Sequence, residues 1–211
     1  MTSTNAQPRG YFKYTLAADC ETSGLCFSSD NPACNPDTGE EYQALSWGLI
    51  VVDTDTLEAV DSLYVEIQHD PKYTWSDGAQ KVHGMTREYL KENGVPMEEA
   101  VTQIASLILK YWGPSSPVCL LGHNVATFDL PFLRHTLRSQ GIEVKFANRH
   151  IDSFAAGVST FQTYNSDDLF EAVGLPERDP AHHNALDDAM ASLNAVRVIR
   201  RLWASFVEPN I

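Results

Sequence analysis

The stretch LAADCETSGL, residues 16–25, ends an apolar run with two acids, Asp19 and Glu21. Successive side chains of a β-strand point to opposite faces, so these two carboxylates would share one face and Cys20 would occupy the other. Two like charges held close together must take up a proton, remain in solvent or share a cation. The stretch therefore predicts a strand that ends at a solvated or cation-binding site.

Two further strands are predicted after this first one, which we place at residues 11–20. ALSWGLIVVD (44–53) is a long apolar run, and LYVEI (63–67) alternates between apolar and polar residues. The turn-like sequence DTDTLEA joins them. Three strands in series predict an antiparallel meander at the start of the domain.

Three elements are predicted in the middle of the chain. Apolar residues at helical spacing over 96–113 indicate a helix, with acids in its first turn where the helix dipole favours them. VCLLGHN (118–124) indicates a short buried strand. TFDLPFLRHTLRSQG (127–141) indicates a helix with Thr127 as its N-cap and Gly141 at its end.

A last helix is predicted from about Asn184 to Phe206, where apolar residues line one face and arginines the other. Strands followed by alternating helices and strands predict an α/β domain. We expect a central mixed five-stranded sheet, with three antiparallel strands first and then parallel strands, flanked by helices. We assign 1–10 to a polar N-terminal tail, 11–206 to the single domain and 207–211 to a C-terminal tail.

The composition indicates a soluble, cytoplasmic protein with one core. The chain has 211 residues, 43% of them hydrophobic, and no apolar run long enough to cross a bilayer. Its net charge of −13 argues against a long, nonspecific grip on duplex nucleic acid, but bound divalent cations can invert the local field. Four cysteines without a CxxC pair favour reduced thiols over a disulfide framework.

Two other stretches carry side chains suited to chemistry. GHNVATFDLPFL places Asp129 in the first turn of a helix directly after a buried strand, where open α/β sheets usually hold ligands. The helix dipole alone would also explain an acid there. AHHNALDDAMAS places Asn184 at an N-cap, Asp188 in the first turns of the helix and His183 on the preceding loop, from which both side chains can turn toward one site.

The segments DCETSGL, HNVATFD and HNALDDA, in this order and in these contexts, resemble the three motifs of the DEDDh 3′–5′ exonucleases. That family has the ribonuclease H-like fold and includes the proofreading subunit of bacterial DNA polymerase III, ribonuclease T and oligoribonuclease. The resemblance covers roughly residues 11–206. A neighbouring subgroup has a tyrosine four residues before its last aspartate. Here that position is Asn184, and His183 lies five residues before Asp188, which indicates the histidine variety.

The resemblance implies two divalent cations, Mg²⁺ or Mn²⁺, and His183 as the general base. The implied metal ligands are Asp19, Glu21, Asp129 and Asp188. Asp19 would bridge the ions, Glu21 and Asp188 would complete the ion that holds the attacking water, and Asp129 would serve the second ion through a water. Oxygen ligands suit these ions, and two ions about 3.5–4 Å apart can activate water and stabilise a departing oxygen. A histidine that titrates near neutrality can take the proton.

The resemblance also implies residues that hold the terminal nucleotide. In the family these follow the Asp-x-Glu pair, which here gives Thr22, Ser23, Gly24 and Leu25. Leu25 is a candidate wedge against the last base.

Other substrate candidates have equally simple structural explanations. KVHGMT matches the family's His-Gly turn near the terminal sugar at His83 and Gly84, but a loop leading to a short helix capped by Thr86 explains it about as well. The remaining candidates, which could instead belong to the core or satisfy buried backbone groups, are His123, Asn124, Phe128 and Trp75.

Residues 26–42, CFSSDNPACNPDTGEEY, predict a surface loop inserted beside the expected substrate entrance. The insertion could select substrates or dock a partner, and an inert insertion explains it equally well. A zinc site formed by Cys20, Cys26 and Cys34 is disfavoured, because Cys20 would face away from the loop.

The sequence therefore predicts a metal-dependent 3′–5′ exonuclease that releases 5′-mononucleotides from single-stranded DNA or RNA. Nucleic acid 3′ ends are the expected partners. The choice of DNA or RNA, a polymerase or replication partner for proofreading, and a homodimer all stay open. Two alternatives are a noncatalytic nucleic-acid- or protein-binding module on the same fold, and a two-metal phosphoesterase of small nucleotides.

Overall fold

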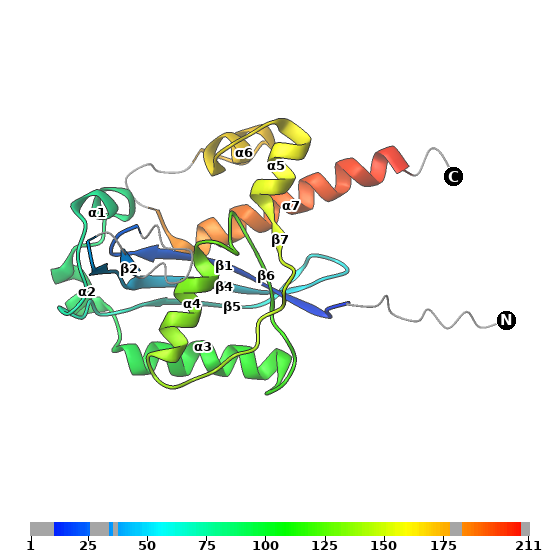
Figure 1. The fold of residues 1–211 in the computed structure, drawn as a ribbon. Helices are drawn as coiled ribbons and strands as arrows, with labels where there is room; N and C mark the ends of the chain where they lie inside the picture. Colours follow the sequence, from blue (N-terminus) through cyan, green and yellow to red (C-terminus); the bar gives the residue numbers. More distant parts are fainter. Residues whose placement is uncertain (1–10, 26–33, 36–37, 178–182, 208–211) are drawn as a thin grey trace.

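The structure is a computed structural model that describes residues 11–25, 34–35, 38–177 and 183–207. Figure 1 shows a central sheet with α3 and α4 below it and α5, α6 and α7 above it. The elements are, in chain order, β1 (Tyr14–Thr22), β2 (Cys34–Asn35), β3 (Glu40–Glu41), β4 (Ala44–Asp53), β5 (Ala59–Glu66), α1 (Asp77–His83), α2 (Arg87–Asn93), α3 (Met97–Trp112), β6 (Cys119–Gly122), α4 (Asp129–Arg138), β7 (Ile151–Asp152), α5 (Ser153–Phe161), α6 (Ser166–Ala172) and α7 (Ala185–Val207).

The main sheet has five strands in the order β5-β4-β1-β6-β7. β5, β4 and β1 pair antiparallel, and β1, β6 and β7 pair parallel, which confirms the predicted mixed sheet. β4 spans the predicted residues, whereas β1 runs from Tyr14 to Thr22 and β5 begins at Ala59 rather than at residue 63. Pairing with β4 extends β5 through exposed residues that lack an alternating pattern.

Side chains alternate along β1 between two packed layers. Cys20 lies in the larger apolar cluster, which includes residues of α3 and α4, whereas Ala17 lies in a second cluster with Ala189 of α7. A fully buried aliphatic side chain in such a layer stabilises the fold by about 1.5–3 kcal/mol. Asp19 and Glu21 thus share one face and Cys20 lies on the other, as the sequence predicts, and the structure shows that the shared face is the one covered by α7.

The three predicted helices are present as α3, α4 and α7, but Thr127 is not the N-cap of α4. The Thr127 hydroxyl lies 3.1 Å from the backbone oxygen of Asn124 and 2.7 Å from its side-chain oxygen, and donates there instead. Asn124 has a φ of 59°, so the chain turns sharply after β6. The helix begins at Asp129 after this turn and ends at Arg138, short of the predicted end at Gly141.

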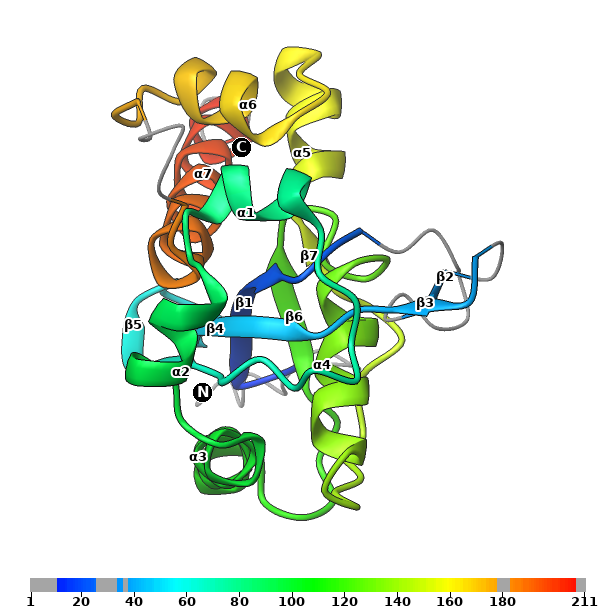
Figure 2. The ribbon, with the colours of Figure 1, turned by 90° about the vertical axis from the view of Figure 1, so that its left-hand side faces the viewer.

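The insertion at 26–42 contains more than the predicted loop. Cys34–Asn35 pairs antiparallel with Glu40–Glu41, and we call this pair the inserted ribbon. Figure 2 shows it projecting to the right from the end where β4 begins.

Some predictions fall outside the described residues. These are the tails at 1–10 and 208–211, Cys26 and the side chain of Cys34. Cys20 is a buried free thiol in the core cluster. No helix in the described part of the chain is both long and apolar enough to cross a membrane.

Candidate metal and substrate site

The site lies where β6 ends and β1 continues. β1 pairs with β6 only as far as Ala17 opposite Leu121, but its pairing with β4 continues to Thr22. The end of β6 crosses β1 closely, because a side chain at Gly122 would lie 2.7 Å from the backbone oxygen of Ala18. The carboxyl end of β1 is thus open on one edge, which is the usual ligand crevice of an open α/β sheet.

Asp129, at the start of α4, fills part of this open edge. Its side chain is 2% exposed, and burial raises its pKa to about 7, assisted by the charge of Glu21 and opposed by hydrogen bonds with Cys20. Its Oδ1 has no hydrogen-bond partner among the described residues. A carboxylate buried in this way would gain from a nearby cation.

The start of α7 lies directly against β4. Gly48 pairs with Asp19 across the two strands. A Cβ at Gly48 would lie 2.2 Å from the backbone of Ala185 and Leu186, so only glycine fits under this turn. A glycine inside an apolar strand is a known sign of close backbone approach, and the sequence prediction did not use it.

Two contacts fix the loop that precedes α7. The Asn184 side-chain oxygen accepts hydrogen bonds from the backbone N–H groups of Leu186 at 3.0 Å and Asp187 at 3.3 Å, which confirms the predicted N-cap. The backbone N–H of His183 donates to the backbone oxygen of Val82 in α1, at 3.4 Å. The start of α7 is therefore fixed with respect to both the sheet and α1.

Glu21, His183 and Asp188 meet above the sheet. Their ligand atoms all lie within 4.8 Å of one another, and His183 Nδ1 is 3.3 Å from Asp188 Oδ2. Asp19 lines the same hollow of about 210 Å³, which we call the carboxylate hollow. Asp129 is not among the residues that line it, and instead contacts Cys20 behind it. The donor set, one histidine with several carboxylates, fits a divalent cation.

A second hollow of about 440 Å³ adjoins the first and shares Cys20 and Glu21 with it. We call it the α1 hollow, because α1 contributes much of its wall. Of the predicted substrate residues, it is lined by Thr22, Leu25, His83 and Phe128. Leu25 is 58% exposed at its edge, and thus available to a ligand.

Three other predicted substrate residues make contacts within the chain. Ser23 is buried, and its side-chain oxygen accepts a hydrogen bond from the backbone N–H of Gln43 at 2.9 Å. Gly24 makes room for the ring of Tyr42, which a Cβ would approach to 2.2 Å. Asn124 is not among the residues lining either hollow, and its backbone N–H donates to Asp152 Oδ1.

His83 supplies a polar group to the α1 hollow. Its Nδ1 accepts a hydrogen bond from the backbone N–H of Met85 at 3.1 Å, so the neutral ring carries its proton on Nε2. That Nε2 is buried and makes no well-formed hydrogen bond among the described residues, although the Thr22 backbone lies near enough to favour the protonated ring. Burial lowers the His83 pKa to about 4. The ring is therefore a neutral donor over the physiological pH range.

The remaining candidates divide between the site and the core. The KVHGMT turn ends α1 at Gly84, with a φ of 72°, and Thr86 caps α2 as expected. His123 lines the carboxylate hollow, with Nδ1 3.2 Å from Ser153 Oγ. Trp75 bonds Gln80 through its ring N–H and packs partly buried against a separate core cluster, which favours its structural role.

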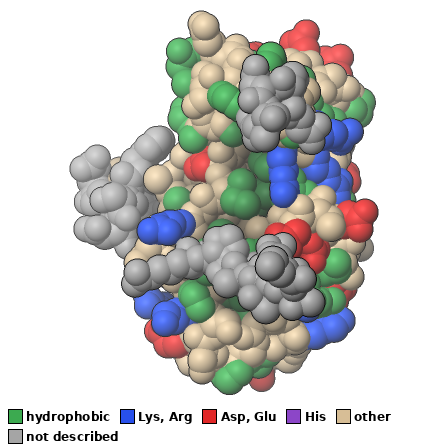
Figure 3. Space-filling view, turned by 90° about the vertical axis from the view of Figure 1, so that its right-hand side faces the viewer, with side chains coloured by type: hydrophobic (Ala, Val, Ile, Leu, Met, Phe, Trp, Pro, Cys, Tyr) green, Lys and Arg blue, Asp and Glu red, His purple; other side chains and the backbone are tan. Residues whose placement is uncertain are grey.

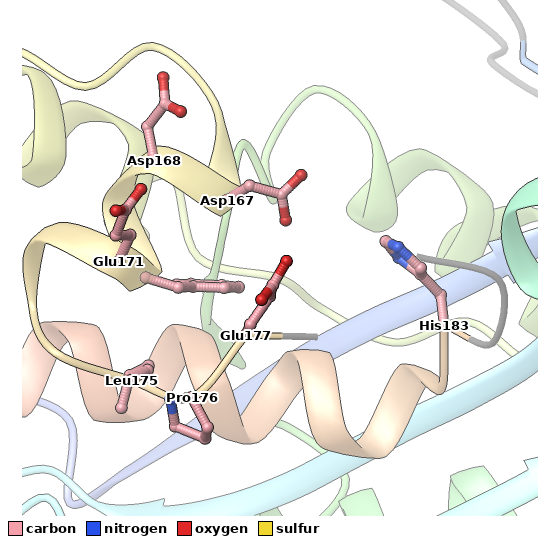
Figure 4. Close-up of a pocket in the computed structure, with 8 residues that line it drawn as sticks. Asp167, Asp168, Glu171, Leu175, Pro176, Glu177 and His183 are labelled. Carbon is pink, nitrogen blue, oxygen red and sulfur yellow. The ribbon is translucent and has the colours of Figure 1, made fainter. Parts of the chain in front are cut away.

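An acidic hollow of about 420 Å³ lies on another side of His183, and the sequence prediction missed it. Figure 4 shows the carboxylates of Asp167 and Glu177 and the ring of His183 turned toward the space between them. Asp168 and Glu171 of α6 add further acids, and Phe170 supplies an apolar wall. Such a surface disfavours a polyanion on this side of His183.

Basic side chains gather elsewhere, and Figure 3 shows a group of them on the face at the end that carries the two termini. Arg197, Arg200 and Arg201 of α7 line a groove of about 580 Å³. Arg197 donates to the backbone oxygen of Leu57 at 2.8 Å, and Arg200 to that of Thr54 at 3.1 Å. These contacts tie α7 to the β4–β5 turn.

A family model described as an exonuclease matches residues 16–196. Similar solved structures include the nuclease domain of 3′hExo, a DEDDh family member, bound to rAMP, at 19% identity and a TM-score of 0.63, covering 92% of this chain and 94% of that one. Another is E. coli Exonuclease I in complex with a dT13 oligonucleotide, at 18% identity and a TM-score of 0.70, covering 92% of this chain and 43% of that one. These identities show a shared fold. A comparison with curated proteins found no significant match.

Proposed function

This chain belongs to the exonuclease family, and we propose that it removes nucleotides from the 3′ ends of single-stranded DNA or RNA and releases 5′-mononucleotides. The observation that carries the proposal is the convergence of Glu21, His183 and Asp188, from opposite ends of the chain, within 4.8 Å. Asp19 lines the same hollow. All the motif residues of the DEDDh pattern are present, so a noncatalytic module is the weaker alternative.

The family generally uses divalent metals, and the donor set favours Mg²⁺ or Mn²⁺. When bound, two such ions would activate a water and stabilise the departing oxygen. We assign Asp19, Glu21 and Asp188 as ligands in the carboxylate hollow. The Oδ1 of Asp129, which is buried and has no hydrogen-bond partner in the described part of the chain, supports its assignment to the second ion.

His183 is the proposed general base. Its ring borders both the carboxylate hollow and the acidic hollow, so a water can reach it from the solvent side. The Asp188 carboxylate beside Nδ1 orients the ring and stabilises the imidazolium that forms when the ring takes a proton from the attacking water. Such positioned bases contribute roughly 10²–10⁴-fold in rate.

The α1 hollow is the proposed site of the terminal nucleotide. Leu25 and Phe128 offer apolar contact to a base, and the Nε2–H group of His83 offers a hydrogen bond to an oxygen of the sugar. Because the α1 hollow and the carboxylate hollow share Glu21, a nucleotide held in the first would present its phosphate to the second.

The test is degradation of 5′-labelled single-stranded DNA and RNA oligomers with Mg²⁺ or Mn²⁺, comparing the wild type with Asp19→Ala and His183→Ala. We expect a ladder that shortens from the 3′ end and releases 5′-mononucleotides, and its loss in both variants. A chelator should stop the reaction. Unchanged turnover in both variants, or no need for metal, would contradict the mechanism. Turnover of mononucleotides but not oligomers would favour the phosphoesterase.

A further inference from the structure

The inserted ribbon forms part of the wall of the α1 hollow. Asn35 of β2 and Tyr42, which follows β3, line the hollow together with Val82 of α1 and Phe128. The insertion is therefore adjacent to the place assigned above to the terminal nucleotide.

The base of the ribbon is anchored to the end of β1. The backbone N–H of Ser23 donates to the Gln43 oxygen at 2.8 Å, and the Gln43 N–H donates to Ser23 Oγ at 2.9 Å. The Tyr42 ring lies against Gly24, and its hydroxyl donates to Glu40 Oε2 at 3.0 Å. These contacts fix Tyr42 and the β3 side of the ribbon, with which β2 pairs, with respect to the strand that carries Asp19 and Glu21.

Asn35 differs in chemistry from the other side chains around the hollow. Among the described residues that line it, Asn35 alone carries an amide. An amide offers donors and an acceptor at once, and these groups distinguish one base edge from another. Single-stranded bases are recognised in this way, on edges that pairing would otherwise cover.

We propose that Asn35 contacts the base edge of the 3′-terminal nucleotide and makes the rate of removal depend on that base. The inference rests on the proposed function and extends it to the selection of the terminal base. The apolar side chains of Leu25 and Phe128 accept any base, because every base has a π-face. The preference among bases therefore comes from the inserted ribbon.

The experiment measures kcat/KM on four single-stranded oligomers that differ only in the 3′-terminal base, and on a fifth with an abasic 3′ end. The wild type is expected to show a spread of roughly five- to a hundredfold among the four, the range that one base contact supplies. Asn35→Ala should contract this spread toward unity. Asn35→Asp, which keeps the size but loses the donors, should change the order of the bases. Neither variant should change the rate on the abasic end.

Asn93→Ala is the matched control, because the Asn93 amide is exposed and bonds to the Tyr89 backbone within α2. It should retain the wild-type spread. Equal rates on all four bases in the wild type, or an unchanged spread in both Asn35 variants, would overturn the inference while leaving the exonuclease assignment intact. No hydrolysis of any oligomer by the wild type with Mg²⁺ or Mn²⁺ would overturn both.

Discussion

Gly48 and Ala185 are closer than a side chain would allow, since a Cβ at Gly48 would lie 2.2 Å from the backbone of Ala185. Gly48 pairs with Asp19 in the sheet, and Ala185 begins the helix that carries Asp188. The contact therefore sets the distance between the sheet, which carries Asp19, and the start of α7, which carries Asp188.

Gly48→Ala should move the start of α7 away from the sheet and separate Asp188 and His183 from Glu21. We expect turnover and Mn²⁺ affinity to fall about tenfold or more, as when supports of metal ligands are removed. Mn²⁺ binding measured by electron paramagnetic resonance checks this. Gly113→Ala is the control. Gly113 has a φ of 65°, so its substitution by alanine costs about 1 kcal/mol of stability. It ends α3 in the other layer, far from the start of α7, and should leave the metal site unchanged. Equal effects of the two variants would contradict the positioning role.

Asp188→Asn should reduce turnover more than a hundredfold, because a lost ligand costs more than the 10–100-fold typical of residues that support ligands. Asp187→Asn is the neighbouring control, since Asp187 is exposed and is not among the residues that line the carboxylate hollow. Initial rates on one oligomer at saturating Mg²⁺ compare the two. Similar losses in both variants would argue for a general effect on α7.

In the metal-free protein the contribution of Asp129 to stability should fall as the pH rises from about 4 to about 7, because burial raises the pKa of Asp129 to about 7. His83, whose pKa burial lowers to about 4, contributes with the opposite sign in this range, so the Asp129 contribution is measured as a difference between two variants. Below its unfolded pKa near 3.9 the carboxyl is protonated in both states, and above that value only the unfolded state ionises it freely, which favours unfolding. Asp129→Asn removes this contribution, so in urea unfolding with a chelator present the stability of the variant should rise more, or fall less, than that of the wild type between these pH values. Mg²⁺ should stabilise the wild type more than the variant at pH 7. Parallel pH curves for the two proteins would contradict the prediction.

We expect His83 to contribute to substrate binding only through the hydrogen bond that its Nε2–H group donates. Because burial lowers its pKa to about 4, it stays neutral in the assay range and should not shape the pH profile. His83→Asn can keep the acceptor that Met85 uses but loses the donor, and should raise KM about three- to tenfold, the cost of one hydrogen bond. His83→Gln can restore a donor and should recover part of the loss. Equal KM values for the wild type and His83→Asn would refute the contact.

The affinity for single-stranded oligomers should increase little with oligomer length beyond a few nucleotides. The net charge is −13, and acids line the hollow beside His183, so few phosphates find a cationic partner. Fluorescence anisotropy with oligomers of increasing length, in Ca²⁺ to prevent turnover, measures this. A steep gain with length, together with a strong dependence on salt, would show a longer binding path, for which the groove at Arg197 and Arg200 is the first candidate.

Local patterns predicted the long elements well, because periodicity over ten or more residues is a strong signal. β4, α3 and α7 follow their predicted ranges closely. The short elements β7, α1, α5 and α6 were not predicted, because so few residues give only a weak periodic signal. The local signals that could have found the three helices are their N-caps, Ser76, Asp152 and Asn165. The prediction of Thr127 as an N-cap was wrong because its hydroxyl donates to Asn124 instead. That hydrogen bond depends on the turn after β6.

The sequence by itself determined which residue types were available and how they alternate: the acids at Asp19 and Glu21 on one face, Cys20 on the other, and His183 before a capped helix that carries Asp188. Strand and helix periods fix these relations locally. Only the tertiary structure decided that α7 rests on Gly48, that Asp129 is buried behind Cys20 and that the insertion reaches the α1 hollow at Asn35. These relations join segments far apart in the chain, and burial, close packing and strand pairing set them, none of which a local pattern encodes.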